Sequence, residues 1–200
     1  GKGVTARVAA GRLNKVLEGG LAEVRWQPGD GKHLVALEAA QFDHRLVKFR
    51  QTYHMATYRY FSDLLQTQFE LKSGKFWFSD KGHLLTARHW FGDTSFEILV
   101  RRTQFPEGAH PLLSPYGSKP IKFAGAIITF PLTPQREHRG DWLQLRGEDR
   151  FAYGLVSVVG ETANYASPYF ARFAPIPSTL DGTVFNYDRM SDRYVQSNLH

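Results

Sequence analysis

The sequence predicts a mainly β protein, and three features of its 200 residues carry this prediction. Short apolar runs alternate with polar residues along much of the chain, as strands with one buried face do. Eighteen glycines and ten prolines are spread over the sequence, which favours frequent turns. Aromatic residues make up 14% of the chain and suit strands better than long helices.

The first 65 residues are expected to form a partly helical N-terminal extension. Residues 5–17, with the sequence TARVAAGRLNKVL, place apolar side chains on one helical stripe, and the following glycine pair would end that helix. Residues 21–26, LAEVRW, alternate as a strand does and lead into the turn sequence QPGDGK. Residues 33–65 fit a helix about as well as two strands, because their apolar spacing suits both periods.

After this extension the pattern is clearly β. The runs QFELKS, KFWFS, HLLTA, SFEILVRR and IKFAGAIITF predict consecutive antiparallel strands. Within them, Phe76–Ala87 is expected to form a hairpin that turns at Asp80-Lys81-Gly82. Loops through Pro106–Pro120 and around Pro131 follow, and WLQL, GLVSVV and YFARF predict later strands. We therefore expect one β unit over residues 66–130 and a second over 131–200.

One histidine occupies a position that suits catalysis. In the stretch FWFSDKGHLLTARHWFGDTSFEILVRR, the predicted hairpin delivers His89 to the end of a strand, just before a short turn. A general base needs an imidazole that the scaffold holds with one side open to substrate, and a strand end provides both. A histidine beside aromatic residues is, in most proteins, simply packed or solvated.

The order of a strand, an Asp-Lys-Gly turn, Leu84–Phe91 and the strand Phe96–Val100 resembles the histidine motif of chymotrypsin-fold proteases. It is most similar to the picornavirus, comovirus and potyvirus forms, in which a basic residue precedes the histidine and bulky apolar residues follow it. This resemblance implies a chymotrypsin-like double β-barrel, with the first barrel over residues 66–130 and the second, incomplete, over 131–200. It also implies that His89 acts as general base in a polyprotein-processing endopeptidase.

A catalytic histidine needs a carboxylate that fixes its tautomer and stabilises the imidazolium. Asp141 is the candidate, because it opens the apolar run DWLQL as the family's acidic residue opens a strand. Asp93, Glu97 and Glu107 are competitors, and an ordinary turn aspartate explains Asp141 equally well.

The nucleophile motif of that family is missing from the 200 residues. Neither Gly-x-Cys-Gly nor Gly-x-Ser-Gly occurs, and the chain contains no cysteine. The absence of cysteine also excludes disulfides and thiolate metal sites. The chain is thus expected to be a fragment or an inactive relative of such a protease, and by itself not to cleave peptides.

Charge and composition point to few other partners. A net charge of +6 and basic-aromatic segments such as Tyr58–Phe61 and Arg101-Arg102 predict at most weak, salt-sensitive RNA binding beside a peptide or polyprotein substrate. The histidines lack metal-ligand spacing and no phosphate-binding glycine loop occurs, so no metal or cofactor is expected. No apolar run reaches the length of a membrane helix, which predicts a soluble, non-secreted protein. The resemblance to viral proteases implies the host cell cytoplasm as its location.

Two alternatives stay open at this point. A jelly-roll capsid or other β-rich structural protein would also be basic, aromatic-rich and full of Pro/Gly loops. A protease-like barrel without activity that binds RNA or a protein partner is the second alternative.

Overall fold

The computed structural model describes residues 3–12, 17–44, 49–77, 79–91, 94–107, 119–131, 137–139, 144–146 and 150–160. Every regular element among these residues is a β-strand, which confirms the all-β class. Among them there is no helix that is long and apolar enough to cross a membrane.

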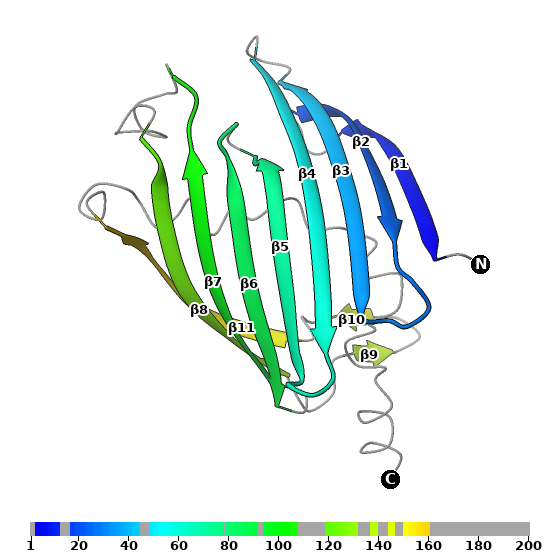
Figure 1. Ribbon diagram of the computed structural model, residues 1–200. Coiled ribbons are helices and arrows are strands. Elements are labelled where there is room, and N and C mark those ends of the chain that lie inside the picture. Colours follow the sequence, from blue (N-terminus) through cyan, green and yellow to red (C-terminus); the bar gives the residue numbers. More distant parts are fainter. Residues whose placement is uncertain are drawn as a thin grey trace.

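Nine long strands form one antiparallel sheet, and nearly all of them follow one another in sequence order. They are β1 (Val4–Arg12), β2 (Leu17–Trp26), β3 (His33–His44), β4 (Phe49–Ser62), β5 (Thr67–Lys75), β6 (Lys81–Phe91), β7 (Thr94–Gln104), β8 (Ile121–Pro131) and β11 (Arg150–Val159). The strands lie side by side as a meander (Figure 1). Each strand contains 9 to 14 residues.

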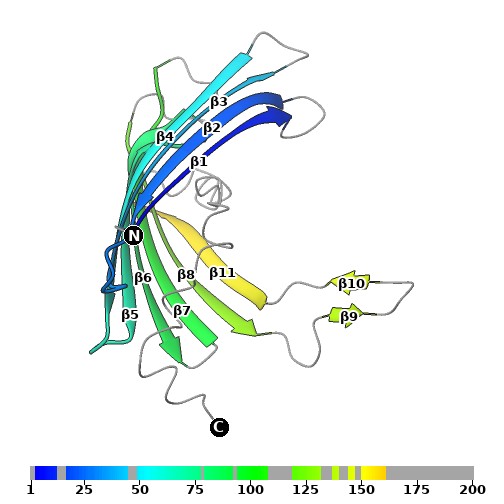
Figure 2. The same ribbon diagram turned by 90° about the vertical axis from the view of Figure 1, so that its right-hand side faces the viewer.

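The sheet is strongly curved (Figure 2), and its nine strands do not close into a barrel. β1 stands at one edge and β11 at the other. A small separate hairpin of β9 (Glu137–Arg139) and β10 (Gln144–Arg146) lies in the connection between β8 and β11. Side chains on the inner side of a curved sheet are more crowded than those on the outer side, so we infer that the buried face of this sheet is the concave one.

The predicted N-terminal helix is wrong, because most of residues 5–17 belong to β1, which pairs with β2 from Val4↔Trp26 to Arg12↔Glu18. Alanine and glycine at many of these positions satisfy the helical and the strand period alike, so the tertiary pairing decides. Residues 33–65, which fitted either structure, form β3 and β4.

The hairpin predicted for Phe76–Ala87 exists with a different turn. Its first strand is β5, which ends at Lys75, and Lys81 and Gly82 already belong to β6, so the turn lies before them instead of at Asp80-Lys81-Gly82. Two backbone hydrogen bonds close the turn: Phe76 N–H donates to the Asp80 carbonyl at 2.7 Å, and Ser79 N–H donates to the Phe76 carbonyl at 3.0 Å. Ser79 adopts a φ of +66° there.

The sheet extends across the expected boundaries of the chain. β4 and β5 pair between residues 54–62 and 67–75, and β11 pairs with β8 along its whole length. The two-barrel arrangement and its division into residues 1–65, 66–130 and 131–200 stay predictions.

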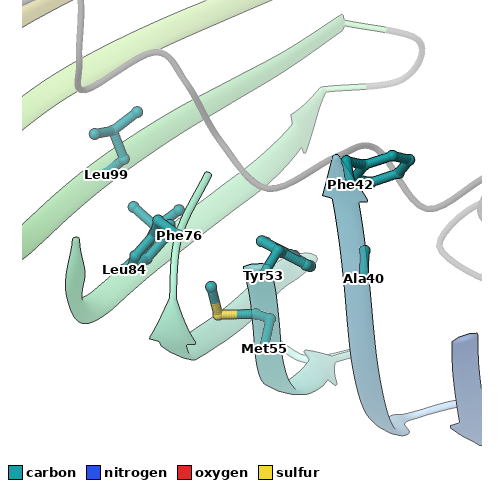
Figure 3. Packing of buried hydrophobic residues seen from close by; sticks show 7 residues of the cluster. All are labelled: Ala40, Phe42, Tyr53, Met55, Phe76, Leu84 and Leu99. Carbon is teal, nitrogen blue, oxygen red and sulfur yellow. The ribbon is translucent and has the colours of Figure 1, made fainter. Parts of the chain in front are cut away.

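A small apolar cluster lies on the buried face. Its members come from strands β3, β4, β6 and β7 and from the turn after β5: Ala40, Phe42, Tyr53, Met55, Phe76, Leu84 and Leu99 (Figure 3). Phe76 is fully buried, because the turn folds over this face of the sheet. Further buried apolar side chains, among them Leu34, Phe61, Ile121 and Phe123, lie outside this cluster, beside the polar side chains described next.

Candidate functional site

His89 lies on β6, two residues before the strand ends, between Thr67 of β5 and Phe96 of β7. Its Nδ1 atom is 2.9 Å from the Thr67 hydroxyl oxygen, and its ring meets the edge of Phe91 with 4.3 Å between centroids. The imidazole therefore sits among a hydroxyl and two aromatic rings, on the same face of the sheet as Leu85 and Phe91.

The proposed acidic partner, Asp141, lies outside the described residues, as does Asp93. Glu97 points to the opposite face of the sheet, where its Oε2 atom accepts a hydrogen bond from Arg88 Nε at 2.7 Å. Glu107 is exposed beyond the end of β7. The pairing of His89 with Asp141 stays a prediction. Side chains alternate between the two faces along β7, so Glu97 lies on the face opposite to His89 and is not its acidic partner.

The face that carries His89, called the exposed face below, is apolar along its middle. Strand pairing aligns Tyr58, Leu71, Leu85, Val100 and Ala124 in one row from β4 to β8. A second row contains Tyr60, Phe69, Ala87, Ile98, Ala126 and Leu155. Leu85 is 52% and Val100 50% exposed. These two rows, called the apolar band, contain no charged residue.

Aromatic side chains gather at one end of the exposed face, where β6 and β8 end and β11 begins. All are exposed, and they form the aromatic belt: Phe91, Phe96, Phe130, Phe151 and Tyr153. Basic side chains gather at the other end, where β5 and β7 end. They form the basic end: His54, Lys75, Lys81, His83, Arg102 and Lys122. The exposed face thus changes from aromatic to aliphatic to basic along the strands.

The opposite, buried face also carries polar and charged side chains, and several of them are buried. Among its buried members are Glu23, Arg25, Gln51, Thr57, Gln68, Glu70, Thr86, Ser95, Glu97, Arg101 and Thr103. Along β7, Glu97 and Arg101 are buried while Phe96, Ile98 and Val100 between and beside them are exposed. A water-soluble sheet has the reverse distribution.

Ion pairs neutralise many of these buried charges. Glu70 accepts from Arg59 Nη2 through Oε2 and from Lys72 Nζ through Oε1, each at 2.7 Å. Burial raises the pKa of Glu70, but Lys72 and Arg59 outweigh burial and bring that pKa down to about 2. Arg88 and Glu97 pair across β6 and β7. Several charged groups of the buried face are therefore paired with a group of opposite charge.

The tightest of these contacts lies where the turn after β5 meets β7. Arg101 and Thr103 both donate to Asp80 Oδ2, and all three residues are buried. Burial lowers the pKa of Arg101, and the carboxylate of Asp80 opposes that shift. Tyr53 of β4 donates to Glu38 Oε2 at 2.8 Å, and burial followed by the Glu38 charge raises the pKa of its phenol.

The sequence motifs that suggested RNA binding are divided between the two faces. Tyr58 and Tyr60 are exposed, whereas Arg59 between them lies on the other face, paired with Glu70. Arg101 is 2% exposed and Arg102 is exposed on the opposite side. RNA binding stays a prediction, without a shared basic-aromatic surface at these segments.

Within the described ranges, no group of three or more His, Asp or Glu side chains is arranged to hold a metal ion. Comparison with known proteins found no matching family model, no similar curated protein and no similar solved structure. The functional argument therefore depends on the geometry of the two faces. The sequence analysis did not predict the difference between the two faces. The charged residues that alternate with apolar ones in β5 and β7 indicated it.

Proposed function

We propose that this chain forms part of the wall of a membrane-spanning β-sheet protein, with its exposed face against lipid and its buried face lining a polar interior. The observation that carries this proposal is an exposed apolar band on one face and buried ion pairs on the other. The exposed face carries the uncharged apolar band along its middle, whereas the buried face carries paired Arg, Lys and Glu residues beside the apolar cluster. Transmembrane β-sheets alternate apolar-out and polar-in in this way.

The free energy of solvation supports this assignment. Removing a large apolar side chain from water stabilises a protein by about 1.5–3 kcal/mol. If the whole apolar band stayed in water, the protein would lack this stabilisation at each of its large side chains. A contiguous apolar surface of this kind marks a face that meets another apolar phase. Backbone amides and carbonyls inside the sheet are paired across strands, which is the condition for entering hydrocarbon.

Strand length and aromatic placement agree with the same proposal. A tilted strand crosses a bilayer with about 9–11 residues. β5 has 9 residues, β6, β7 and β8 have 11 each, and β11 has 10. Aromatic side chains flank the apolar zone of such proteins at the membrane interface, as the aromatic belt flanks the apolar band here.

The concave face defines what this wall would enclose. Glu70 with Arg59 and Lys72, and Glu97 with Arg88, present charge to the interior and suit polar molecules or water. A strand edge cannot stay unpaired in hydrocarbon. The proposal therefore requires strands in addition to the nine described, next to β1 and β11, to close the wall.

Two tryptophans on opposite faces of the sheet provide the test. Trp26 is the last residue of β2 and lies on the exposed face, in the register row of Tyr58, whereas Trp90 lies near the end of β6 on the opposite face, beneath the guanidinium of Arg88. Variants of the full chain that keep one of these tryptophans, with the others changed to Phe, are reconstituted into vesicles whose acyl chains carry bromine. Bromine should quench Trp26 fluorescence strongly and Trp90 fluorescence weakly.

Equal quenching of both tryptophans would contradict the proposed orientation of the faces. A chain that stays with the aqueous phase and shows no quenching at either position would contradict membrane insertion altogether. In that case a water-exposed apolar face would need a protein partner.

The chymotrypsin-type endopeptidase, or a non-catalytic relative, is the alternative proposal. The hydrogen bond between Thr67 Oγ1 and His89 Nδ1, which holds the imidazole, supports it. It predicts that the chain with a nucleophile-bearing extension cleaves peptides in buffer without lipid, and that His89→Ala abolishes cleavage. A membrane-wall role predicts no such activity and only a local effect of His89→Ala on stability.

A further inference from the structure

We infer that the basic end of the exposed face binds the phosphate groups of anionic lipids, an inference that rests on the proposed membrane-wall function. The residues that carry it are Lys75, Lys81, Arg102 and Lys122, which lie at the ends of β5, β6, β7 and β8. Lys81 is paired with Lys75 and Arg102 with Lys122 by the strand register. Four cations thus share two neighbouring rows of one face.

These cations lie next to the apolar band. Leu85 is two residues beyond His83 on β6, and Val100 is two residues before Arg102 on β7, so the same strand face passes directly from aliphatic to basic. Side chains in this position place their heads at the depth of lipid phosphates while their stems cover hydrocarbon. The aromatic belt occupies the other interface, so the two membrane surfaces meet chemically different ends of the sheet.

Among the described residues, no carboxylate neutralises the lysines and the arginine of the basic end. No ion pair joins Lys75, Lys81, Arg102 or Lys122 to a carboxylate in the part of the chain that the structure describes. Lys75 donates to the Thr52 hydroxyl, a neutral acceptor. Asp43, an acidic residue on the same face, is paired with Arg50 at 2.7 Å.

The contrast with the buried face supports a ligand outside the protein. There, Arg59, Lys72 and Arg88 each face a glutamate at about hydrogen-bonding distance. In the described part of the chain, counter-charges therefore lie beside the enclosed cations and none lies beside the cations of the basic end. Phosphate esters of lipid headgroups provide the missing charge and accept hydrogen bonds from ammonium and guanidinium groups.

The experiment uses the full chain in phosphatidylcholine vesicles that contain traces of spin-labelled phosphatidylglycerol or spin-labelled phosphatidylcholine. Lipids in contact with the protein give a motionally restricted component in the electron paramagnetic resonance spectrum. We expect this component to be larger for phosphatidylglycerol than for phosphatidylcholine. High salt should reduce the difference, because the attraction is electrostatic.

Variants locate the preference. Lys81→Gln with Lys122→Gln should bring the ratio of the two association constants toward one, by at most about fivefold for each charge removed. Arg12→Gln with Lys32→Gln is the matched control, because it removes two charges outside the basic end, at the β1–β2 turn and the β2–β3 turn. The control should keep the preference of the unmodified chain.

The outcomes separate this inference from the proposed function. A restricted component of equal size for both lipids would overturn the phosphate-binding inference and leave the membrane wall in place. Absence of any restricted component would overturn the membrane wall itself. A preference that survives in the Lys81/Lys122 variant, or is lost in the control, would show that the basic end is not its source and would also overturn the inference.

Discussion

The guanidinium of Arg101 lies over the ring of Phe76, with 3.9 Å between its central carbon and the ring centroid. Phe76 belongs to the turn after β5 and Arg101 to β7, so this contact fastens the turn onto the buried face. Asp80, at the end of the same turn, accepts a hydrogen bond from Arg101. The turn thus supplies both a ring and a counter-charge to one buried cation.

Removing that counter-charge should be costly. Asp80→Ala leaves Arg101 buried without its carboxylate, and loss of one member of a buried ion pair destabilises a protein by about 3–5 kcal/mol. Asp43→Ala is the control, because Asp43 pairs with Arg50 where both side chains are about half exposed. Its cost should be at most about 1 kcal/mol. Urea unfolding in detergent micelles, followed by tryptophan fluorescence, measures the free energy of unfolding of both variants. Equal decreases for Asp80→Ala and Asp43→Ala would contradict the stabilising ion pair assigned to Asp80.

Glu70 should make stability depend on pH. Its pKa is lowered to about 2 in the folded chain from an ordinary value of 4.5. The ionised folded state is therefore favoured: this contribution is complete above about pH 4.5 and is lost as pH falls toward 2. The shift corresponds to a contribution of about 3 kcal/mol.

Glu70→Gln removes that titration, so its free energy of unfolding should change less between pH 6 and pH 2 than that of the unmodified chain. Glu18→Gln is the control, since Glu18 is exposed and lies 3.8 Å from Arg12. It should retain the original slope. A Glu70→Gln profile parallel to the unmodified one would show that Lys72 and Arg59 do not hold the carboxylate as described.

Much of the strand pattern follows from the sequence. The runs SFEILVRR and IKFAGAIITF alternate with period two and are rich in β-branched and aromatic residues, and they form β7 and β8 as predicted. Small residues explain the failure at β1, where alanines at positions 6, 9 and 10 fit a helix as easily as a strand. Only the pairing with β2 selects the extended form.

The environment of each face was harder to predict than the strands. Period two separates Phe96, Ile98 and Val100 from Glu97 and Arg101, but it does not say which set faces the interior. That choice depends on partners far away in sequence, such as Arg88 for Glu97 and Asp80 for Arg101. The catalytic interpretation of His89 rested on local order alone, and its partner Asp141 lies outside the described residues.

Close backbone packing at Gly82 should exclude any side chain there. A Cβ atom at this position would lie 2.0 Å from the carbonyl oxygen of Arg102 on the neighbouring strand. Gly82→Ala must therefore push β6 and β7 apart, and we expect a loss of about 1–3 kcal/mol. Gly29→Ala is the control, because a Cβ atom at Gly29 meets nothing within 4 Å. Urea unfolding compares the two, and a neutral Gly82→Ala would mean that the strands are spaced more widely.

A charge placed in the apolar band discriminates most sharply between lipid and water on the exposed face. Ile98 is 51% exposed in the middle of the band, so in a water-soluble protein Ile98→Arg should change stability by less than about 0.5 kcal/mol. If Ile98 faces the hydrocarbon of a bilayer, the same substitution should lower the free energy of unfolding by about 2–4 kcal/mol. Gln104→Arg is the matched control, since Gln104 lies on the same face of β7 beside the basic end and should tolerate arginine in either environment.

The free energy of unfolding of both variants is measured in phospholipid vesicles by denaturant titration, with folded chain recovered in the lipid fraction as a second readout. We expect Ile98→Arg to unfold at lower denaturant and to be depleted from the lipid fraction, while Gln104→Arg behaves as the unmodified chain does. If Ile98→Arg is as stable as Gln104→Arg, the exposed face meets water and the membrane-wall proposal is wrong. Leu85→Arg, in the other row of the band, repeats the measurement at an independent position on β6.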